Sequence, residues 1–339
     1  MTHNHLYPMT FTPVLKDYLW GGRNLATRLG RELPAGIIAE SWEIAGHEDG
    51  TSVVDNGPYA GWPLTRVHDQ LGLDLIGRNN AWAQSRGKFP LLVKLLDAQQ
   101  PLSVQVHPDD AYALAREGNE LGKTEMWVIL HAEPGAELIL GARRGTTRQA
   151  FRQAIQDHDL EPYLNRVTVS AGDHVCVPAG TLHAIMGGLL IAEIQQNSNT
   201  TYRVYDWGRV GTDGRPRPLH VDQALDVIDF QRAEPRPVPP TVIAEEQGFR
   251  RELLCSNAYF VTERLVLDAG VEFGSACTGD SLEIWGVIEG DATVRDGAAN
   301  EVALEAVRFV LLPAALGEYG VTAGSRATLL RTYVVAQNE

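Results

Sequence analysis

Cysteine, long apolar runs and positive charge are all scarce in this sequence, and each scarcity excludes a class of protein. The three cysteines, Cys176, Cys255 and Cys277, are odd in number and form no CxxC pair, so neither a disulfide framework nor a zinc ribbon is supported. No run of about 18 apolar residues occurs, which argues against a transmembrane helix. The N-terminal residues lack the basic start and the apolar stretch of a signal peptide. A cytoplasmic location is therefore expected.

The charge balance of the chain is acidic. Its 339 residues include 29 Lys and Arg against 43 Asp and Glu, which gives a formal net charge of −14 at pH 7. Such a surface repels nucleic acid and anionic membranes, so the sequence predicts neither of them as a partner. If the ligand is an anion, the basic residues that bind it have to be concentrated in one place.

Turn-forming residues divide the chain into many short apolar segments. With 33 Gly and 18 Pro, the pattern predicts a mainly β protein with a smaller helical part. Strands are expected at Ile38–Ala45, Leu91–Leu96, Leu102–His107, Met126–His131, Arg166–Ser170, His174–Val177 and Leu189–Gln195. Helical periodicity is found at Leu64–Leu75, Pro108–Arg116, Arg148–Gln156 and Val221–Ile228, with Asp109 and Thr147 as N-terminal caps.

A proline-rich stretch, Ala233–Val242, indicates a linker, because proline at this density continues neither a helix nor a central strand. The sequence therefore predicts one domain over 1–235 and a second, strand-rich domain over 243–339. One motif recurs between them: VCVPAGTLH at Val175–His183 and VLLPAALGE at Val310–Glu318. The alternatives are a repeated barrel in which Glu318 has replaced the histidine, and coincidence.

Candidate metal ligands stand two residues apart in a predicted strand. In Ser103–His107 polar and apolar residues alternate, so Gln105 and His107 share one face of the strand. Glu125 enters the next predicted strand, and the Pro-x-Gly turn before His183 places that histidine at the start of another. Two imidazoles and a carboxylate suit zinc, and a glutamine oxygen is an acceptable fourth ligand. Each of these residues could instead be a hydrogen-bonded core residue.

The segment from Gly172 to His183 resembles the second signature of the cupin superfamily, which is a glycine, five residues, Pro-x-Gly, two residues and a histidine. The first cupin signature usually carries His-x-His, whereas this chain has Gln-x-His and a glutamate eighteen positions further on. That departure is typical of type I mannose-6-phosphate isomerases. The segments LSVQVHPDDAYA, GKTEMW and VPAGTLHAI, between Leu102 and Ile185, resemble that family closely.

The resemblance implies a cupin (jelly-roll) β-barrel with a small helical part and a degenerate cupin-like β domain at the C-terminus, as in the shorter bacterial form of the family. It implies one Zn²⁺ per chain. It further implies interconversion of mannose 6-phosphate and fructose 6-phosphate through a cis-enediol(ate). The implied metal ligands are Gln105, His107, Glu125 and His183. His174 could pair with Cys176 by strand parity, but the family does not use that position, and His220 is interpreted as a surface or structural residue.

The same resemblance points to further groups around the sugar phosphate. Arg203 is expected near the reacting sugar or its phosphate, with Lys123, Lys94 and Glu193 as further cationic or proton-transfer groups. Lys94 and Glu193 each interrupt an apolar strand, so a structural ion pair between them is the alternative. Trp20 and Glu40 are expected along the pocket, and Arg209 is a further candidate for binding the phosphate.

Two other functions compete with the isomerase. Two histidines and a carboxylate also match the facial triad of non-haem iron oxygenases, although Gln105 and the nearby cations argue against it. The third is a non-catalytic sugar-binding cupin, against which the presence of Lys123 and Arg203 argues. A monomer that binds a small sugar phosphate is the expectation.

Overall fold

The computed structural model describes residues 6–211 and 214–336. They form two compact units, and neither is one continuous stretch of chain. Unit 1 combines Met1–Val14, Trp42–Val93 and Pro239–Glu339, and unit 2 combines Leu15–Ser41 and Lys94–Val238. The change of unit after Val238 falls inside the proline-rich stretch. A division into domains over 1–235 and 243–339 stays a prediction.

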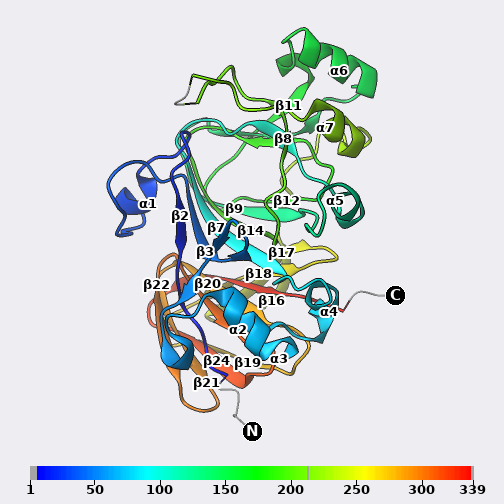
Figure 1. The fold of residues 1–339 in the computed structure, drawn as a ribbon. Helices are drawn as coiled ribbons and strands as arrows, with labels where there is room; N and C mark the ends of the chain where they lie inside the picture. Colours follow the sequence, from blue (N-terminus) through cyan, green and yellow to red (C-terminus); the bar gives the residue numbers. More distant parts are fainter. Residues whose placement is uncertain (1–5, 212–213, 337–339) are drawn as a thin grey trace. The chain divides into compact units, whose positions relative to one another are not determined.

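Unit 2 is built around two antiparallel sheets, drawn mostly in cyan and green in Figure 1. The first has the spatial order β11 (Leu164–Thr168), β10 (Glu137–Ala142), β13 (His183–Ile185), β8 (Val104–Val106), β15 (Tyr202–Tyr205). The second has the order β12 (His174–Val177), β9 (Glu125–Ala132), β14 (Leu189–Gln196), β7 (Leu91–Ala98), β3 (Glu40–Ile44), β2 (Val14–Lys16). The division between the units falls within β7, β3 and β2. A mainly β fold is therefore confirmed, and β10 and β15 are strands that the sequence patterns did not predict.

Side chains along the strands of the first sheet alternate between its two faces, so that one face packs against the second sheet and the other packs against helices. Leu138 and Ile185 of the first sheet share a buried cluster with Trp127 and Ile191 of the second. On the opposite side, β8 turns Val104 toward a second cluster that covers the sheet with helices. These helices include α6 (Arg148–Gln156) and α7 (Val221–Val227), and the unit also holds α1 (Asn24–Thr27), α5 (Asp110–Arg116) and η3 (Glu161–Tyr163).

Two helix caps predicted from the sequence are confirmed. The Asp109 side chain accepts a hydrogen bond from the Tyr112 backbone N–H at the start of α5, at 2.8 Å. The Thr147 hydroxyl does the same for Ala150 at the start of α6, at 3.1 Å. Each cap satisfies a backbone donor that has no partner within its helix. The cap at Asp109 fixes where the chain leaves β8.

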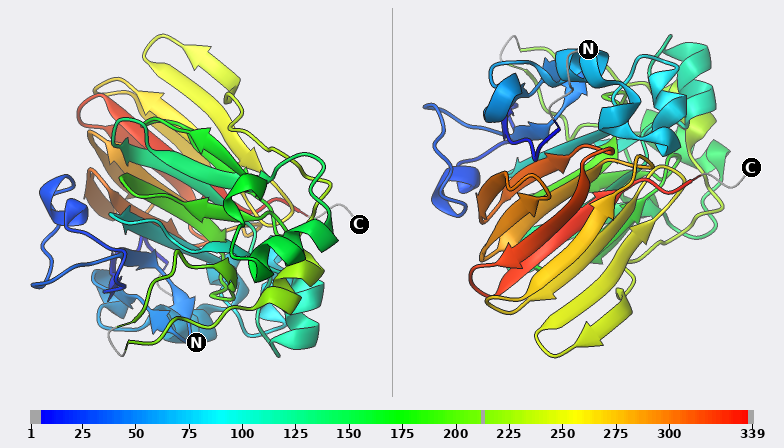
Figure 2. Two further views of the ribbon diagram at one scale, coloured as in Figure 1. Left: turned by 90° about the horizontal axis from the view of Figure 1, so that it is seen from above. Right: turned by 90° about the horizontal axis from the view of Figure 1, so that it is seen from below.

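Unit 1 also contains two antiparallel sheets, seen in yellow to red in Figure 2. The larger has the order β16 (Thr241–Glu246), β17 (Phe249–Ser256), β18 (Val261–Leu267), β25 (Ala327–Tyr333), β20 (Glu283–Glu289), β23 (Arg308–Leu312). The smaller has the order β19 (Glu272–Cys277), β24 (Gly317–Ala323), β21 (Asp291–Asp296), β22 (Glu301–Glu305).

Short elements complete unit 1. Two strand pairs, β1 (Phe11–Thr12) with β6 (Val53–Val54) and β4 (Gly46–His47) with β5 (Gly50–Thr51), accompany η1 (Gly57–Tyr59), η2 (Arg78–Asn80) and α4 (Ala81–Gln84). The helix expected over Leu64–Leu75 is divided into α2 (Leu64–Leu71) and α3 (Leu73–Ile76). Gly72 separates them with a positive φ of 52°, a conformation that glycine adopts at little cost. Within the described residues, no helix is long and apolar enough to cross a membrane.

The motif that recurs in the sequence also recurs in the structure. In unit 2, β12 of one sheet leads through Pro178 to β13 of the other, and in unit 1, β23 leads through Pro313 to β24 in the same way. The register differs by one residue, however. His183 is buried, whereas Glu318 at the matching position is exposed and its neighbour Tyr319 is buried.

Candidate metal centre and its cavity

Strand pairing places Gln105 between two other strands of the first sheet of unit 2. In the register of the sheet, Gln105 is the direct partner of His183 on β13 and of Arg203 on β15. Directly paired residues project from the same face of a sheet. Three polar side chains from separate parts of the chain therefore stand side by side in the space between the two sheets.

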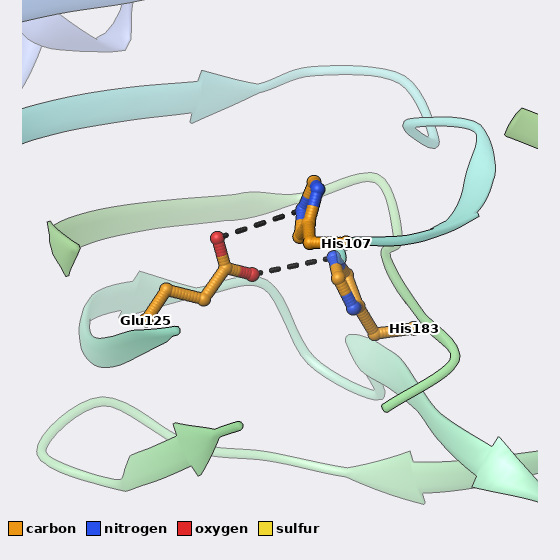
Figure 3. Close-up of side chains that lie close together, drawn as sticks. All are labelled: His107, Glu125 and His183. Atoms are coloured by element: carbon orange, nitrogen blue, oxygen red, sulfur yellow. Dashed lines mark ion pairs between the residues drawn. The ribbon is translucent and has the colours of Figure 1, made fainter. Parts of the chain in front are cut away.

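His107, Glu125 and His183 converge on one point. One ligand-type atom from each of them lies within 4.8 Å of the others, and all three side chains are buried. His107 comes from the residue after β8, Glu125 from the first residue of β9 and His183 from the first residue of β13. Figure 3 shows the Glu125 carboxylate facing both imidazoles. The start of a strand at His183 is confirmed.

Backbone carbonyls fix the orientation of both rings. Nδ1 of His107 lies 2.7 Å from the Thr200 carbonyl, and Nδ1 of His183 lies 2.9 Å from the Thr181 carbonyl. A carbonyl oxygen only accepts hydrogen bonds, so Nδ1 carries the proton in each ring and Nε2 carries a lone pair. Both lone pairs point to the side of Glu125, as in histidine ligands held by an outer hydrogen bond.

The hydrogen-bond partners of the Glu125 carboxylate indicate whether a cation fits at this site. Its Oε1 lies 3.2 Å from Nε2 of His183, yet it has no hydrogen-bond partner among the described residues. Its Oε2 lies 3.7 Å from Nε2 of His107. Carboxylate oxygens that face imidazole lone pairs repel them, and a cation between them removes this repulsion. The buried triad is therefore consistent with a metal site.

Lys123 adds a permanent positive charge beside the triad. Its Nζ donates to Oε2 of Glu125 at 2.5 Å and to Oε1 of Glu193 at 3.2 Å, and it lies 3.2 Å from Nε2 of His107. The ammonium thus connects the metal-type ligands to a second buried carboxylate. Glu193 lies on β14 and is buried as well.

Burial and neighbouring charges determine the protonation states of the cluster. Burial, with the positive charge of Lys123 as the next cause, lowers the pKa of His107 well below its usual value. Burial likewise lowers the pKa of His183 to about 4 and raises that of Glu125 to about 8. Both rings are thus neutral near pH 7, which is the state that binds a metal, whereas burial favours a proton on the metal-free Glu125, which a bound metal would displace.

The Lys123–Glu193 pair remains ionised in spite of its burial. Burial alone would lower the pKa of Lys123, but the charges of Glu125 and Glu193 outweigh it and raise that pKa. Burial alone would raise the pKa of Glu193, but Lys123 and Lys94 outweigh it and lower that pKa. The cavity therefore contains an ionised carboxylate and an ammonium group in direct contact with each other.

A cavity of about 300 Å³ in unit 2 opens beside the triad. Several residues expected at the site line it, namely Trp20, Glu40, Lys94, Gln105, Lys123, Glu125, Glu193 and Arg203. Lys94 also lies 3.5 Å from Glu40 as an ion pair. The sequence reasoning did not identify further lining residues, among them Tyr18, Ser103, Asn199, Thr201, Arg217 and His220.

Arg203 is anchored by its own sheet and the loop after it. Its Nε donates to the Ser103 hydroxyl at 3.1 Å, and its Nη1 donates to the Pro218 carbonyl at 3.1 Å. The Ser103 hydroxyl in turn lies 3.2 Å from Oε1 of Gln105. The backbone N–H of Arg203 donates to Nδ1 of His220 at 3.3 Å, so His220 holds the backbone of Arg203 and also lines the cavity.

Two further arginines, Arg217 and Arg209, are held by the buried carboxylate of Asp206. Asp206 accepts two hydrogen bonds from Arg217, at 2.8 and 2.6 Å, and one from Arg209 at 2.7 Å. Of these, Arg217 lines the main cavity, while Arg209 lines a neighbouring hollow between Asp17 and Gly211. Burial, then the positive charge of Arg217, lowers the pKa of Arg203. Positive charge is therefore concentrated at one side of the cavity, as the acidic net charge required.

The fold and the site define a mainly β protein of paired antiparallel sheets with a metal-type triad beside a cation-lined cavity. A model of the catalytic domain of type I phosphomannose isomerases matches residues 9–125. A mannose-6-phosphate isomerase of Streptococcus mutans is 39% identical over 265 residues, 78% of this chain and 80% of the relative. The probable mannose-6-phosphate isomerase GmuF of Bacillus subtilis is 46% identical over 229 residues, 67% of this chain and 69% of the relative.

Solved structures agree with these sequence relatives. The crystal structure of mannose 6-phosphate isomerase from Bacillus subtilis superposes with a TM-score of 0.85 at 32% identity, covering 96% of this chain and 99% of that one. This chain belongs to the type I phosphomannose isomerase family, and the resemblance found in its sequence is confirmed.

Proposed function

We propose that this protein is a metal-dependent aldose–ketose isomerase that interconverts mannose 6-phosphate and fructose 6-phosphate through a cis-enediol(ate). The observation that carries the proposal is the convergence of His107, Glu125 and His183 beside a cavity that also contains Lys123 and Glu193. The names of relatives supply mannose 6-phosphate, the family resemblance supplies fructose 6-phosphate, and the residues of this chain supply the chemistry. A monomer with one small sugar phosphate bound is the expected working form.

The proposed metal is one Zn²⁺, held by His107, Glu125, His183 and Gln105. Two imidazole nitrogens and a carboxylate are ordinary zinc ligands. Nε2 of the Gln105 amide lies 3.4 Å from Nε2 of His183, so the amide oxygen would face the same point once the amide is turned over. Bound there, the metal would act as a Lewis acid that polarises sugar oxygens. Lys123 would balance the negative charge of Glu125 on the other side.

Proton transfer is assigned to the buried pair of Lys123 and Glu193, with Lys94 as the adjacent cation. The reaction moves one proton between neighbouring carbons, so one group has to accept it and return it. Glu193 is an ionised carboxylate that lines the cavity, and the protonated Nζ of Lys123 lies 3.2 Å from it. Lys94 and its partner Glu40 would orient the sugar hydroxyls from the neighbouring strands β7 and β3. Trp20 would form an apolar wall.

The phosphate is assigned to the arginine side of the cavity. Arg203 and Arg217 both line it, and guanidinium groups bind phosphate oxygens through paired hydrogen bonds. Asp206 holds Arg217 in place and lies between Arg217 and Arg209. Arg209 itself would support this cluster from the neighbouring hollow, without touching the phosphate.

A coupled assay tests the proposal. The purified protein should interconvert the two sugar phosphates, lose the activity after treatment with a chelator and regain it with Zn²⁺. Absence of turnover in fully metal-loaded protein would contradict the isomerase function. Oxygen consumption with Fe²⁺ would favour a cupin oxygenase, and binding of the sugar phosphate without turnover would favour a non-catalytic cupin.

A further inference from the structure

The segment Gly122–Thr124, which carries Lys123 into the cavity, belongs to no helix or strand. Irregular segments are usually the mobile parts of a fold. A side chain that has to act within a fraction of an ångström needs a rigid support instead, because a misplacement of about 1 Å can cost 10²-fold in rate. The structure therefore has to hold this segment by long-range contacts.

All three backbone N–H groups of the segment are held by such contacts. The Gly122 N–H donates to Oδ1 of Asp110 at 2.7 Å, and the Lys123 N–H donates to the Pro108 carbonyl at 2.9 Å. The Thr124 N–H donates to Oε1 of Gln196 at 2.8 Å. The partners come from two other places in the chain, the start of α5 and the end of β14.

Asp110 and Gln196 are also joined to each other. Nε2 of Gln196 donates to the same Oδ1 of Asp110 at 3.1 Å. The orientation of the Gln196 amide is unambiguous, since a backbone N–H requires an oxygen and a carboxylate requires a donor. Gln196 is fully buried, and its own backbone N–H donates to the Thr124 carbonyl at 3.0 Å. The two side chains thus form a bridge across both ends of the segment.

Close packing reinforces the bridge. A Cβ atom added to Gly122 would lie 2.5 Å from the backbone atoms C of Asp109 and N of Asp110. No side chain fits in that space, so the backbone of the segment rests directly on the first turn of α5. The bridge thus connects three parts of the site. They are the chain just after His107, the segment that carries Lys123 and leads into Glu125, and the strand that carries Glu193.

We propose that Asp110 and Gln196 are positioning residues that set the place of Lys123 and Glu125 relative to Glu193. Neither side chain lines the cavity, and each acts only through backbone groups of the segment. The inference rests on the proposed isomerase for its kinetic consequence. Its structural consequence, the rigidity of residues 122–124, can be measured without any turnover.

Asp110→Ala removes the shared acceptor, and Asp110→Asn is the conservative rescue because the amide oxygen can accept the same two hydrogen bonds. Asp109→Ala is the matched control, since the Asp109 side chain caps the same helix through the Tyr112 N–H, whereas only the backbone of Asp109 packs against the segment. Gln196→Met breaks the other half of the bridge with a side chain of similar length. Each variant is compared with the whole wild-type protein in excess Zn²⁺.

The first measurement is amide hydrogen exchange over residues 122–124, followed by mass spectrometry. Exchange should become at least about tenfold faster in Asp110→Ala and in Gln196→Met, and stay within about twofold of wild type in Asp110→Asn and Asp109→Ala. Unchanged exchange in Asp110→Ala would overturn the proposal. Equal acceleration in Asp109→Ala would overturn it as well, because loss of the helix cap would then be the cause.

The second measurement is steady-state kinetics with saturating metal. Turnover, kcat, should fall about 10- to 100-fold in Asp110→Ala and in Gln196→Met while KM changes less than about threefold, because the arginine side of the cavity is untouched. The double variant should be no slower than the worse single variant, since both remove the same bridge. A wild-type kcat in Asp110→Ala, or a loss in Asp110→Asn equal to that in Asp110→Ala, would overturn the proposal. Absence of turnover in the wild type would instead count against the isomerase, with the exchange data still testing the bridge.

Discussion

The cluster around Lys123 in unit 2 and a cluster around Arg331 in unit 1 are both made of charged side chains buried between two antiparallel sheets. In unit 1, Arg331 donates to Glu283 through Nε at 2.7 Å and through Nη2 at 2.6 Å. Tyr319 and Trp285 donate to the same carboxylate, at 2.5 and 3.1 Å. Both oxygens of Glu283 are therefore occupied by donors of the chain itself.

The neighbouring carboxylate of unit 1 is occupied in the same way. Glu263 accepts two hydrogen bonds from Arg251, at 2.9 and 2.7 Å, and one from Tyr333 at 2.9 Å. In unit 2, by contrast, Oε1 of Glu125 faces Nε2 of His183 and has no hydrogen-bond partner within residues 6–211 and 214–336. Buried polar groups are normally satisfied, so a buried carboxyl oxygen that faces an imidazole nitrogen without a donor is consistent with a metal site. Both clusters are charged and buried, and they differ in whether a carboxylate oxygen is left without a donor. We call the cluster around Lys123 the open cluster and the cluster around Arg331 the closed cluster.

The largest expected effect comes from removing one imidazole of the open cluster. His183→Ala should lose the bound metal and reduce kcat/KM about 10³-fold, which corresponds to about 4 kcal/mol of transition-state stabilisation. Elemental analysis and the coupled assay measure the two quantities. Retention of a full equivalent of metal would show that His183 is not a ligand.

Metal removal should affect stability as well as activity. A metal present at about 1,000 times its dissociation constant stabilises the native state by about 4 kcal/mol, so a chelator should lower the melting temperature of the wild type. The same chelator should leave the melting temperature of His183→Ala unchanged. An equal decrease in both proteins would place the relevant metal elsewhere.

The closed cluster should respond in stability alone. Arg331→Met leaves the buried Glu283 without its cation, which should lower the free energy of unfolding by about 3 kcal/mol, with metal content and kcat unchanged. Denaturant unfolding measures the loss. Adding Glu283→Gln to this variant should restore part of it, because the uncompensated charge is then gone. Loss of metal in Arg331→Met would contradict the separation of the two clusters.

Arg203→Ala tests the cationic side of the open cluster. Turnover should fall about 10²-fold, because a donor aimed at the substrate is lost in a site where one such donor contributes about 3 kcal/mol. Metal content should remain at the wild-type level, since Arg203 reaches the triad only through Ser103 and Gln105. Wild-type turnover would exclude a role for Arg203 in the reaction.

The smallest effect is expected where the recurring motif has lost its histidine. Glu318→Gln should change the free energy of unfolding by less than about 0.5 kcal/mol, because the side chain is exposed. Tyr319→Phe, at the buried neighbour, removes a hydrogen bond to Glu283 and should cost about 1 kcal/mol or more. Equal effects of the two substitutions would contradict the one-residue difference in register.

Local patterns in the sequence determined much of this protein. Alternation in Ser103–His107 placed Gln105 and His107 on one face, because side chains along a strand repeat every two residues. The caps at Asp109 and Thr147 followed from hydrogen bonds that reach only three residues along the chain. The spacing of Gly172, the Pro-x-Gly turn and His183 carried the family resemblance. The roles assigned to these residues remain predictions of that resemblance.

Tertiary structure alone decided which side chains surround those residues. Arg203 follows a polar stretch in the sequence, yet pairing with β8 places it beside Gln105. Arg217 and His220 reach the cavity from a loop with no strand or helix pattern, and Glu318 faces solvent because its strand is shifted by one residue. Strand pairing and loop closure depend on contacts between residues far apart in the chain, which local periodicity does not contain. The residue types of the site were therefore readable in the sequence. Whether a buried group of charges became an open or a closed cluster was decided by pairing between distant strands.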